Sequence, residues 1–137
     1  VRPRQSRMIK FSLTGSSTGA TGEQPCFGDL GVERAGYSLS FSATKSSVQL
    51  ASSSHERGDP TDLVAGLEGK IDVDGTSYVL SGFLVTFSFG ELKVEERGRI
   101  SSSSSPVNKQ LVNDVLDCIL ASQADRFISK VAALGDV

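Results

Sequence analysis

The spacing of apolar residues changes once along this chain, and this change constrains the fold more than any other feature of the sequence. From Met8 to about Phe89, apolar and polar residues alternate, which is the pattern of strands with one buried face. From Val107 onward, apolar residues recur every three or four positions, which is the pattern of a helix. Strands first and helices last predict an α+β domain, with an antiparallel meander sheet of about six strands over residues 8–95 and two helices over residues 106–135.

Five segments carry the strand signals. MIKFSLT (8–14) predicts the first strand, and the alternation is clearest in GYSLSFSAT (36–44). LEGKIDV (67–73) and SYVL (77–80) flank Asp74–Gly75, a pair that suits the positive φ angles of a tight hairpin turn. FLVTFSF is expected to place one face on the core, formed by Phe83, Val85, Phe87 and Phe89.

The segments between these strands are predicted to be irregular or extended. Residues 15–31 are rich in Gly, Thr and Ser, and they predict a loop with room for one short strand. SVQLAS (47–52) is predicted to form a strand that pairs with 36–44 across Lys45–Ser46. Residues 52–62 predict a polar loop.

The two helices have predicted boundaries as well as predicted faces. Ser105–Pro106 predicts the start of the first helix, because a hydroxyl caps the first turn and proline fits the next position. Ser122 with Asp125 resembles a capping box for the second helix, and Gly135 is expected to end it. The residues expected to turn inward are Val107, Leu111, Val112, Val115, Leu116, Cys118 and Ile119 in the first helix, and Phe127, Ile128, Val131 and Leu134 in the second.

Charge is unevenly distributed along the chain. Of 14 basic and 16 acidic residues, the first ten positions hold four bases and no acid, which leaves 10 bases against 16 acids over residues 11–137. We predict a basic arm at residues 1–7 and one domain at residues 8–137. Such an arm favours a polyanionic partner or serves solubility. No apolar run is long enough to cross a membrane and the N-terminus lacks a signal-peptide pattern, so no membrane partner is expected.

Patterns of catalysis and metal binding are missing from the sequence. His55 is the one histidine, and beside Glu56 and Arg57 it is expected to be solvated rather than to act as a general base. A zinc site needs several His or Cys ligands at close spacing, and Cys26 and Cys118 are predicted to be buried free thiols. No phosphate-binding glycine motif or nucleophile elbow is present. The sequence therefore predicts no enzyme and no cofactor.

A row of hydroxyls, Ser38, Ser40 and Ser42, occupies one face of the clearest strand and is followed by Thr44 and Lys45. Serine is common here, at 22 of 137 residues, and a polar sheet face can simply be exposed to solvent. Two helices can cover only one face of such a sheet, however, and serine is a poor strand former. Hydroxyls hydrogen-bond phosphates, sugars and base edges, so this face is a candidate ligand surface.

Three segments resemble the coat proteins of single-stranded RNA bacteriophages. YSLSFSATKSS (37–47) resembles their RNA-binding strand, LVTFSF (84–89) their final strand, and LVNDVLDCILASQADRFISKVAAL (111–134) their two-helix tail. The resemblance implies an intertwined homodimer in which the helices of each subunit cross onto the sheet of its partner. The broad apolar stripe over residues 107–119 agrees with this exchange, because two helices of about 14 residues cover a six-stranded sheet poorly.

The resemblance also implies a function. The chain would be the structural coat protein of a small single-stranded RNA phage, assembled in the bacterial cytoplasm into an icosahedral virion whose interior is lined by the hydroxyl face. Ser40 and Ser42 would line an adenine pocket, and Thr44 and Lys45 would lie near phosphates. The predicted RNA-binding residues are Ser38, Ser40, Ser42, Thr44, Lys45 and Lys70.

A second class of function stays open. The segment GLEGKIDVDGTSYVLSGFLVTFSFGELKVE (66–95) has the texture of some small bacterial immunity proteins of the α+β kind. The acidic body of the chain would suit a basic toxin. The alternative is therefore a protein-binding module that neutralises a toxin. The two classes differ in size, because a coat protein forms megadalton particles and an immunity protein is a monomer or dimer.

Overall fold

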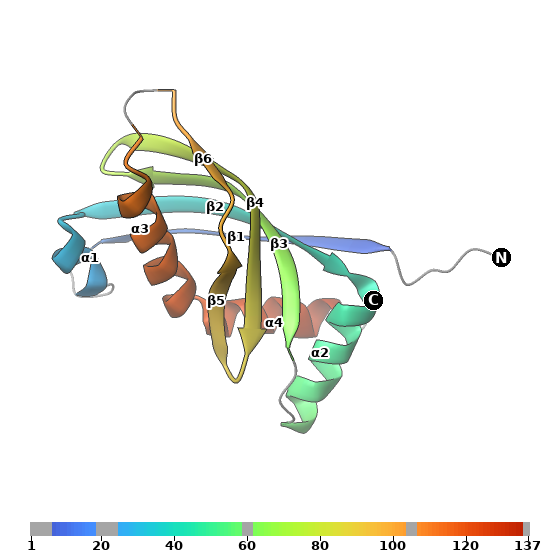
Figure 1. Cartoon of the computed structure of the whole chain (residues 1–137). Coiled ribbons are helices and arrows are strands. Elements are labelled where there is room, and N and C mark those ends of the chain that lie inside the picture. Colours follow the sequence, from blue (N-terminus) through green and yellow to red (C-terminus); the bar gives the residue numbers. More distant parts are fainter. Residues whose placement is uncertain (1–6, 19–24, 59–61, 104–106, 136–137) are drawn as a thin grey trace.

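An antiparallel six-stranded sheet followed by two C-terminal helices confirms the predicted α+β class (Figure 1). The computed structural model describes residues 7–18, 25–58, 62–103 and 107–135. The strands lie in the order β1-β2-β3-β4-β5. The sixth strand, β6, pairs with residues 79–81 of β4, whereas β5 pairs with residues 84–88 of the same strand. The elements are β1 (Met8–Thr18), α1 (Pro25–Leu30), β2 (Arg34–Thr44), α2 (Lys45–Arg57), β3 (Leu63–Val73), β4 (Thr76–Ser88), β5 (Glu91–Glu96), β6 (Arg99–Ser101), α3 (Lys109–Ser122) and α4 (Ala124–Leu134).

The predicted Asp74–Gly75 turn joins β3 to β4. Both residues have positive φ angles, 47° and 94°, as a tight hairpin turn requires. The Asp74 carboxylate also accepts hydrogen bonds from the backbone N–H groups of Glu33 (3.1 Å) and Arg34 (2.9 Å). The turn therefore positions the start of β2 as well as closing its own hairpin.

A helix, α2, follows β2 directly, so the strand predicted at 47–52 is wrong, and the loop predicted at 52–62 is wrong as far as Arg57. The Thr44 hydroxyl caps the first turn by accepting from the N–H of Ser47 (3.3 Å), and Gly58 ends the helix with a φ of 78°. Small residues carry much of the buried face, so the apolar pattern of the segment does not reveal its helical period. The buried residues are Val48, Ala51, Ser52 and Ser54.

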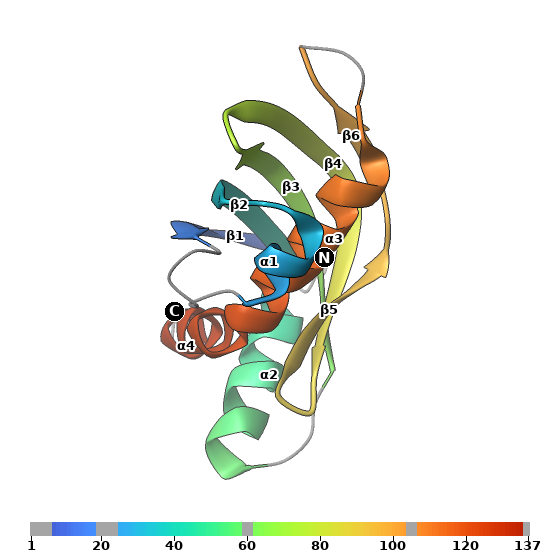
Figure 2. The same cartoon turned by 90° about the vertical axis from the view of Figure 1, so that its left-hand side faces the viewer.

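Small residues also let α2 pack closely against α4 (Figure 2). The Ser52 hydroxyl donates a hydrogen bond to the backbone carbonyl of Ala132 (3.4 Å). A side chain at Gly135 would collide with Ser52. The contact between the two helices thus depends on the absence of bulk at Ser52 and Gly135.

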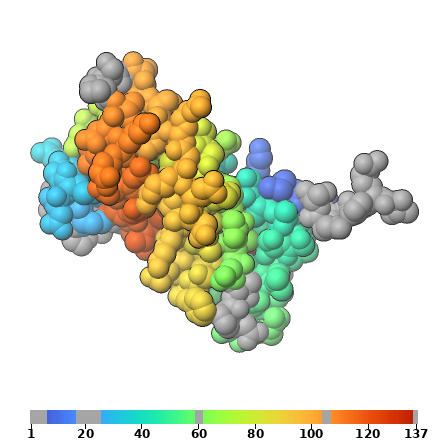
Figure 3. Space-filling view, in the orientation of Figure 1, coloured from blue at the N-terminus to red at the C-terminus, as the bar shows by residue number. Residues whose placement is uncertain are grey.

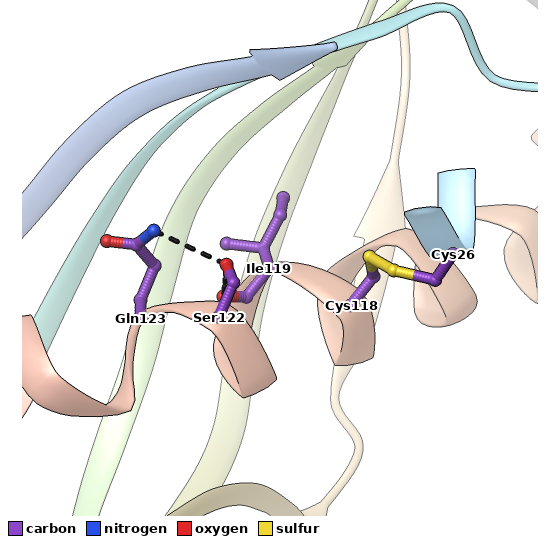
Figure 4. The surroundings of a disulfide bond; sticks show 5 residues. All are labelled: Cys26, Cys118, Ile119, Ser122 and Gln123. Carbon is purple, nitrogen blue, oxygen red and sulfur yellow. Dashed lines mark hydrogen bonds between the residues drawn. A yellow bond between two sulfur atoms is a disulfide. The ribbon is translucent and has the colours of Figure 1, made fainter. Parts of the chain in front are cut away.

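A disulfide between Cys26 and Cys118 joins α1 to α3 (Figure 4), and the prediction of two free thiols is wrong. The two Cα atoms are 6.3 Å apart although 92 positions separate the residues in sequence. Residues 15–31 hold more regular structure than the predicted loop, because β1 continues to Thr18 and α1 follows before β2. No local pattern can pair two cysteines at such a separation; only the packing of α1 on α3 does so.

The caps of the C-terminal helices differ from the predicted ones. The Asn108 side chain caps α3 by accepting from the N–H of Leu111 (3.1 Å), while Ser105 and Pro106 lie outside the described residues. The capping box is wrong, because a single residue separates α3 from α4 and Ser122 still belongs to α3. Its hydroxyl donates to the carbonyl of Ile119 (2.8 Å; Figure 4). The predicted end of the second helix is confirmed, since α4 stops at Leu134 before Gly135.

Helices α3 and α4 pack on one face of their own curved sheet (Figures 1 and 2). Val112, Val115 and Leu116 have no exposed surface within the single chain, and Phe127 and Val131 of α4 have none either. The sheet of the same chain curves around the helices and covers Val112, Val115 and Leu116, whereas Val107 and Leu111 are half-buried. The homodimer itself stays a prediction.

The apolar face predicted for residues 83–89 ends at Phe87, because β4 ends at Ser88. Phe83, Val85 and Phe87 are buried as predicted. Phe89 instead begins the turn between β4 and β5, with a φ of 52°, and 78 % of it is exposed. The chain reverses there, so the strand alternation no longer decides the direction of its side chain.

Candidate nucleic-acid interface

The hydroxyl row on β2 lies on the sheet face that the helices leave uncovered. Ser38 is exposed, and Ser40 and Ser42 are half-buried. The intervening Leu39 and Phe41 are at most 1 % exposed and point into the core. The two predicted faces of this strand are therefore confirmed.

Each serine of this hydroxyl row stands opposite residues of β1 and β3, so the pairing of the strands forms further rows that run across the sheet. Lys10 of β1 stands opposite Ser42, which stands opposite Gly66 of β3, and Gly66 in turn stands opposite Leu84 of β4. The next row along the strands contains Ser12, Ser40 and Glu68. A third row contains Thr14, Ser38, Lys70 and Val79.

A hollow of about 330 Å³ opens on this face. Gly66 leaves room in the first row, because a Cβ there would lie 2.9 Å from the Ser42 hydroxyl oxygen. Gly82 lies where the pairing of β3 with β4 is irregular, and its φ is 73°. Glycine inside a strand often marks a bulge or the close approach of a ligand. The polar residues that line the hollow are Lys10, Ser40, Ser42 and Glu68.

The charge of this face is mixed. Lys10 and Lys70 contribute positive charge, whereas Glu68 and Asp72 contribute negative charge from the same face of β3. Lys70 is among the RNA-binding residues predicted from the sequence, whereas Lys10 and Glu68 are not. The alternation in residues 8–14 and 67–73 is the signal that could have found both, since it already places them on the face opposite the core.

Thr44 and Lys45 lie at the end of β2, away from the centre of the hollow. The Thr44 hydroxyl accepts from the N–H of Ser47 and donates to the Ser47 hydroxyl (2.7 Å), so it serves the cap of α2. The Lys45 N–H donates to the carbonyl of Arg7 (2.8 Å). The last residue of the predicted basic arm therefore lies beside Lys45, while residues 1–6 lie outside the described part of the chain. Of the six predicted RNA-binding residues, the structure places the three serines and Lys70 together.

Tyr37 lies on the opposite side of β2, which the helices cover. Burial raises the pKa of its phenol above the ordinary value, and the nearby Arg126 guanidinium lowers that pKa in part. Arg126 donates hydrogen bonds to the Tyr37 hydroxyl (3.5 Å) and to the backbone carbonyl of Thr14 (3.2 Å). This pair thus ties α4 to β1 and β2 and takes no part in the open face.

Among the described residues, no three His, Cys, Asp or Glu side chains gather closely enough to hold a metal ion. Their helices are also too short or too polar to cross a bilayer. His55 is exposed near the end of α2.

No protein-family model matches this chain, and neither a curated protein nor a solved structure matches it. The resemblance to phage coat proteins therefore depends on the sequence patterns of residues 37–47, 84–89 and 111–134. The open face has groups that could bind a ligand whatever the resemblance: a hydroxyl row, two lysines and a hollow over Gly66.

Proposed function

We propose that this chain is the coat protein of a small single-stranded RNA phage and that it contacts RNA with the open face of its sheet. The observation that carries the proposal is the polar face of β2, where Ser38, Ser40 and Ser42 alternate with buried Leu39 and Phe41 and none of the described helices covers them. The antiparallel sheet and the two helices at its C-terminal end agree with the resemblance described above, whereas α1 and α2 lie between strands.

Single-stranded RNA suits the chemistry of this face better than a duplex does. Hydroxyls and lysines can hydrogen-bond base edges, ribose and phosphate, and single-stranded bases are free to present those edges. Glu68 beside Ser40 would repel a phosphate, so we expect bases or ribose over the hollow and phosphates nearer to Lys10 and Lys70.

The basic arm complements a face of low net charge. Salt-dependent affinity for nucleic acid grows with the number of phosphates that lysine and arginine neutralise. The open face offers few such contacts, whereas residues 1–7 contain three arginines and no acid. Arg7 leaves the sheet beside Lys45, at one end of the hydroxyl strand. The arm therefore supplies non-specific affinity and the face supplies selectivity.

The edges of the sheet offer a route to assembly. β1 and β5 are the outermost strands of the main strand order, and edge strands present unpaired backbone groups to other chains. Since α3 and α4 are already buried on their own sheet, we place contacts between copies at edges and exposed surfaces rather than in exchanged helices.

Purification followed by electron microscopy tests the proposal directly. We expect closed particles that contain RNA, with a ratio of nucleic-acid to protein absorbance that stays high after nuclease treatment. Removal of residues 1–7 should lower that ratio while the circular dichroism spectrum is unchanged, because the arm lies before β1. A monomer or dimer without RNA that instead binds a basic toxin would overturn the coat assignment in favour of the immunity-type module.

A further inference from the structure

Phe89 occupies a position that is unfavourable for it in two respects. It is 78 % exposed, and it has a φ of 52° in the two-residue turn between β4 and β5. Gly90, the second turn residue, has a φ of 78°. Turns with two positive φ angles favour Asn, Asp or Gly, because a bulky side chain is strained there. A strained backbone position that also exposes an aromatic ring points to a role outside the folding of the single chain.

A hollow of about 330 Å³ begins immediately beside this turn, between β5 and α3. Leu92 and Val94 of β5 and Ala121 of α3 contribute its apolar wall. The space-filling view shows β5 and α3 side by side on one face of the molecule (Figure 3). Gly90 lines the hollow but Phe89 does not, so each chain presents an exposed ring next to an apolar hollow that this ring does not fill.

The rim of the hollow carries balanced charge. Lys93 lies 3.4 Å from Glu91, and the Arg97 guanidinium lies 2.9 Å from the Asp117 carboxylate. A strongly acidic or strongly basic partner would meet like charge here. A second copy of the same chain brings two cations and two anions of its own, so opposite charges can meet.

We propose that Phe89 of one copy inserts into the β5–α3 hollow of a second copy, and that the second copy returns the contact. Because the ring and the hollow adjoin each other, one two-fold rotation can satisfy both contacts at once, as an isologous interface requires. The inference rests on the proposed coat function, and it specifies one contact between copies that the sequence analysis did not identify.

The size of the contact predicts how strong it is. A buried phenylalanine removes roughly 150–250 Å² from water, so two of them fall well short of the roughly 1,200–2,000 Å² of a stable interface. The contact should therefore be weak and reversible between isolated pairs. It becomes effective where each subunit makes several such contacts at once, because linked contacts raise the effective concentration.

Phe89→Asn gives the sharpest test, because it should act in opposite directions on folding and on association. Asn relieves the positive-φ strain, so thermal stability should rise, while the dissociation constant measured by sedimentation should increase about 30-fold or more, as for loss of a hot-spot side chain. Leu50→Asn is the matched control. Leu50 is 60 % exposed on α2, so its loss removes a comparable exposed apolar side chain without touching the ring or the hollow.

Blocking the hollow tests the other half of the contact. Ala121→Trp should weaken self-association although Phe89 is intact, and a mixture of Ala121→Trp with Phe89→Asn should regain one of the two contacts and associate more than either variant alone. Particles that form equally well with Phe89→Asn would overturn this contact and leave the coat function standing. A wild-type protein that neither associates nor retains RNA would overturn the coat function itself, and the contact with it.

Discussion

The ring of Phe127 on α4 meets the ring of Phe41 on β2 nearly edge-on, with ring centres 5.1 Å apart and planes inclined by 74°. Phe11 of β1 and Phe87 of β4 lie against the same ring at 5.4 and 5.7 Å. Phe127 thus contacts three strands of its own sheet. This cluster attaches the last helix to the sheet of the same chain.

Phe127→Ala should lower the free energy of unfolding by about 3–5 kcal/mol, because it leaves a cavity among three rings. Urea unfolding followed by circular dichroism measures the change. Leu50→Ala, at an exposed position, should stay within about 0.5 kcal/mol. A loss in Phe127→Ala no larger than that in Leu50→Ala would contradict this packing.

Reduction of Cys26–Cys118 should lower the free energy of unfolding by about 2–4 kcal/mol, since the bond closes a long loop in the unfolded chain. The double variant Cys26→Ser, Cys118→Ser should show the same loss and no response to reductant. Thiol titration of the oxidised protein under denaturing conditions should find no free thiol. Two reactive thiols in that assay would contradict the disulfide.

Replacing Ser40 and Ser42 together with alanine should separate RNA binding from folding. Both side chains lie on the open face, so stability should change by no more than about 0.5 kcal/mol. Binding of a selected RNA hairpin should weaken by roughly 1–3 kcal/mol for each lost base contact. Filter binding or calorimetry on the folded protein measures this effect.

Leu39→Ala provides the converse control on the same strand. It should cost about 2–5 kcal/mol of folding stability through a core cavity and leave RNA binding per folded molecule unchanged. If the serine pair destabilises the fold while RNA binding persists, the open face is not the RNA-binding surface.

The pKa of Tyr37 should rise further in Arg126→Leu, because the guanidinium favours the phenolate and burial disfavours it. Ultraviolet titration on a Tyr78→Phe background isolates this phenol. An unchanged or lower pKa in Arg126→Leu would show that the guanidinium does not act on Tyr37.

The raised pKa of Tyr37 also predicts a pH dependence of stability. The folded chain holds the phenol proton to a higher pH than the unfolded chain, whose tyrosine pKa is about 10. The resulting stabilisation is fully present below pH 10 and is lost as the pH rises from there through the raised folded pKa. Tyr37→Phe should remove this component, which unfolding curves on either side of pH 10 would measure.

Local pattern was enough for the two faces of β2, for the turn between β3 and β4, and for the inward stripe of α4. The two-residue period places Leu39 and Phe41 inside and the serines outside, because successive side chains of a strand point to opposite faces. Asp74–Gly75 predicts its hairpin, since few other pairs tolerate two positive φ angles. The inward stripe of α4 follows from its 3.6-residue period, and Phe127, Ile128 and Val131 are buried as expected.

Tertiary structure decided where distant or small residues were involved. The sequence pattern did not predict helix α2, because small residues such as Ala51 and Ser52 form its buried face. That face is buried only because α4 packs against it. Cys26 and Cys118 pair across 92 positions through the meeting of α1 and α3. The hollow over Gly66 needs four strands in register. Periodicity reports what each residue does relative to its chain neighbours; which surfaces then meet depends on the curvature of the sheet and on packing between segments far apart in the chain.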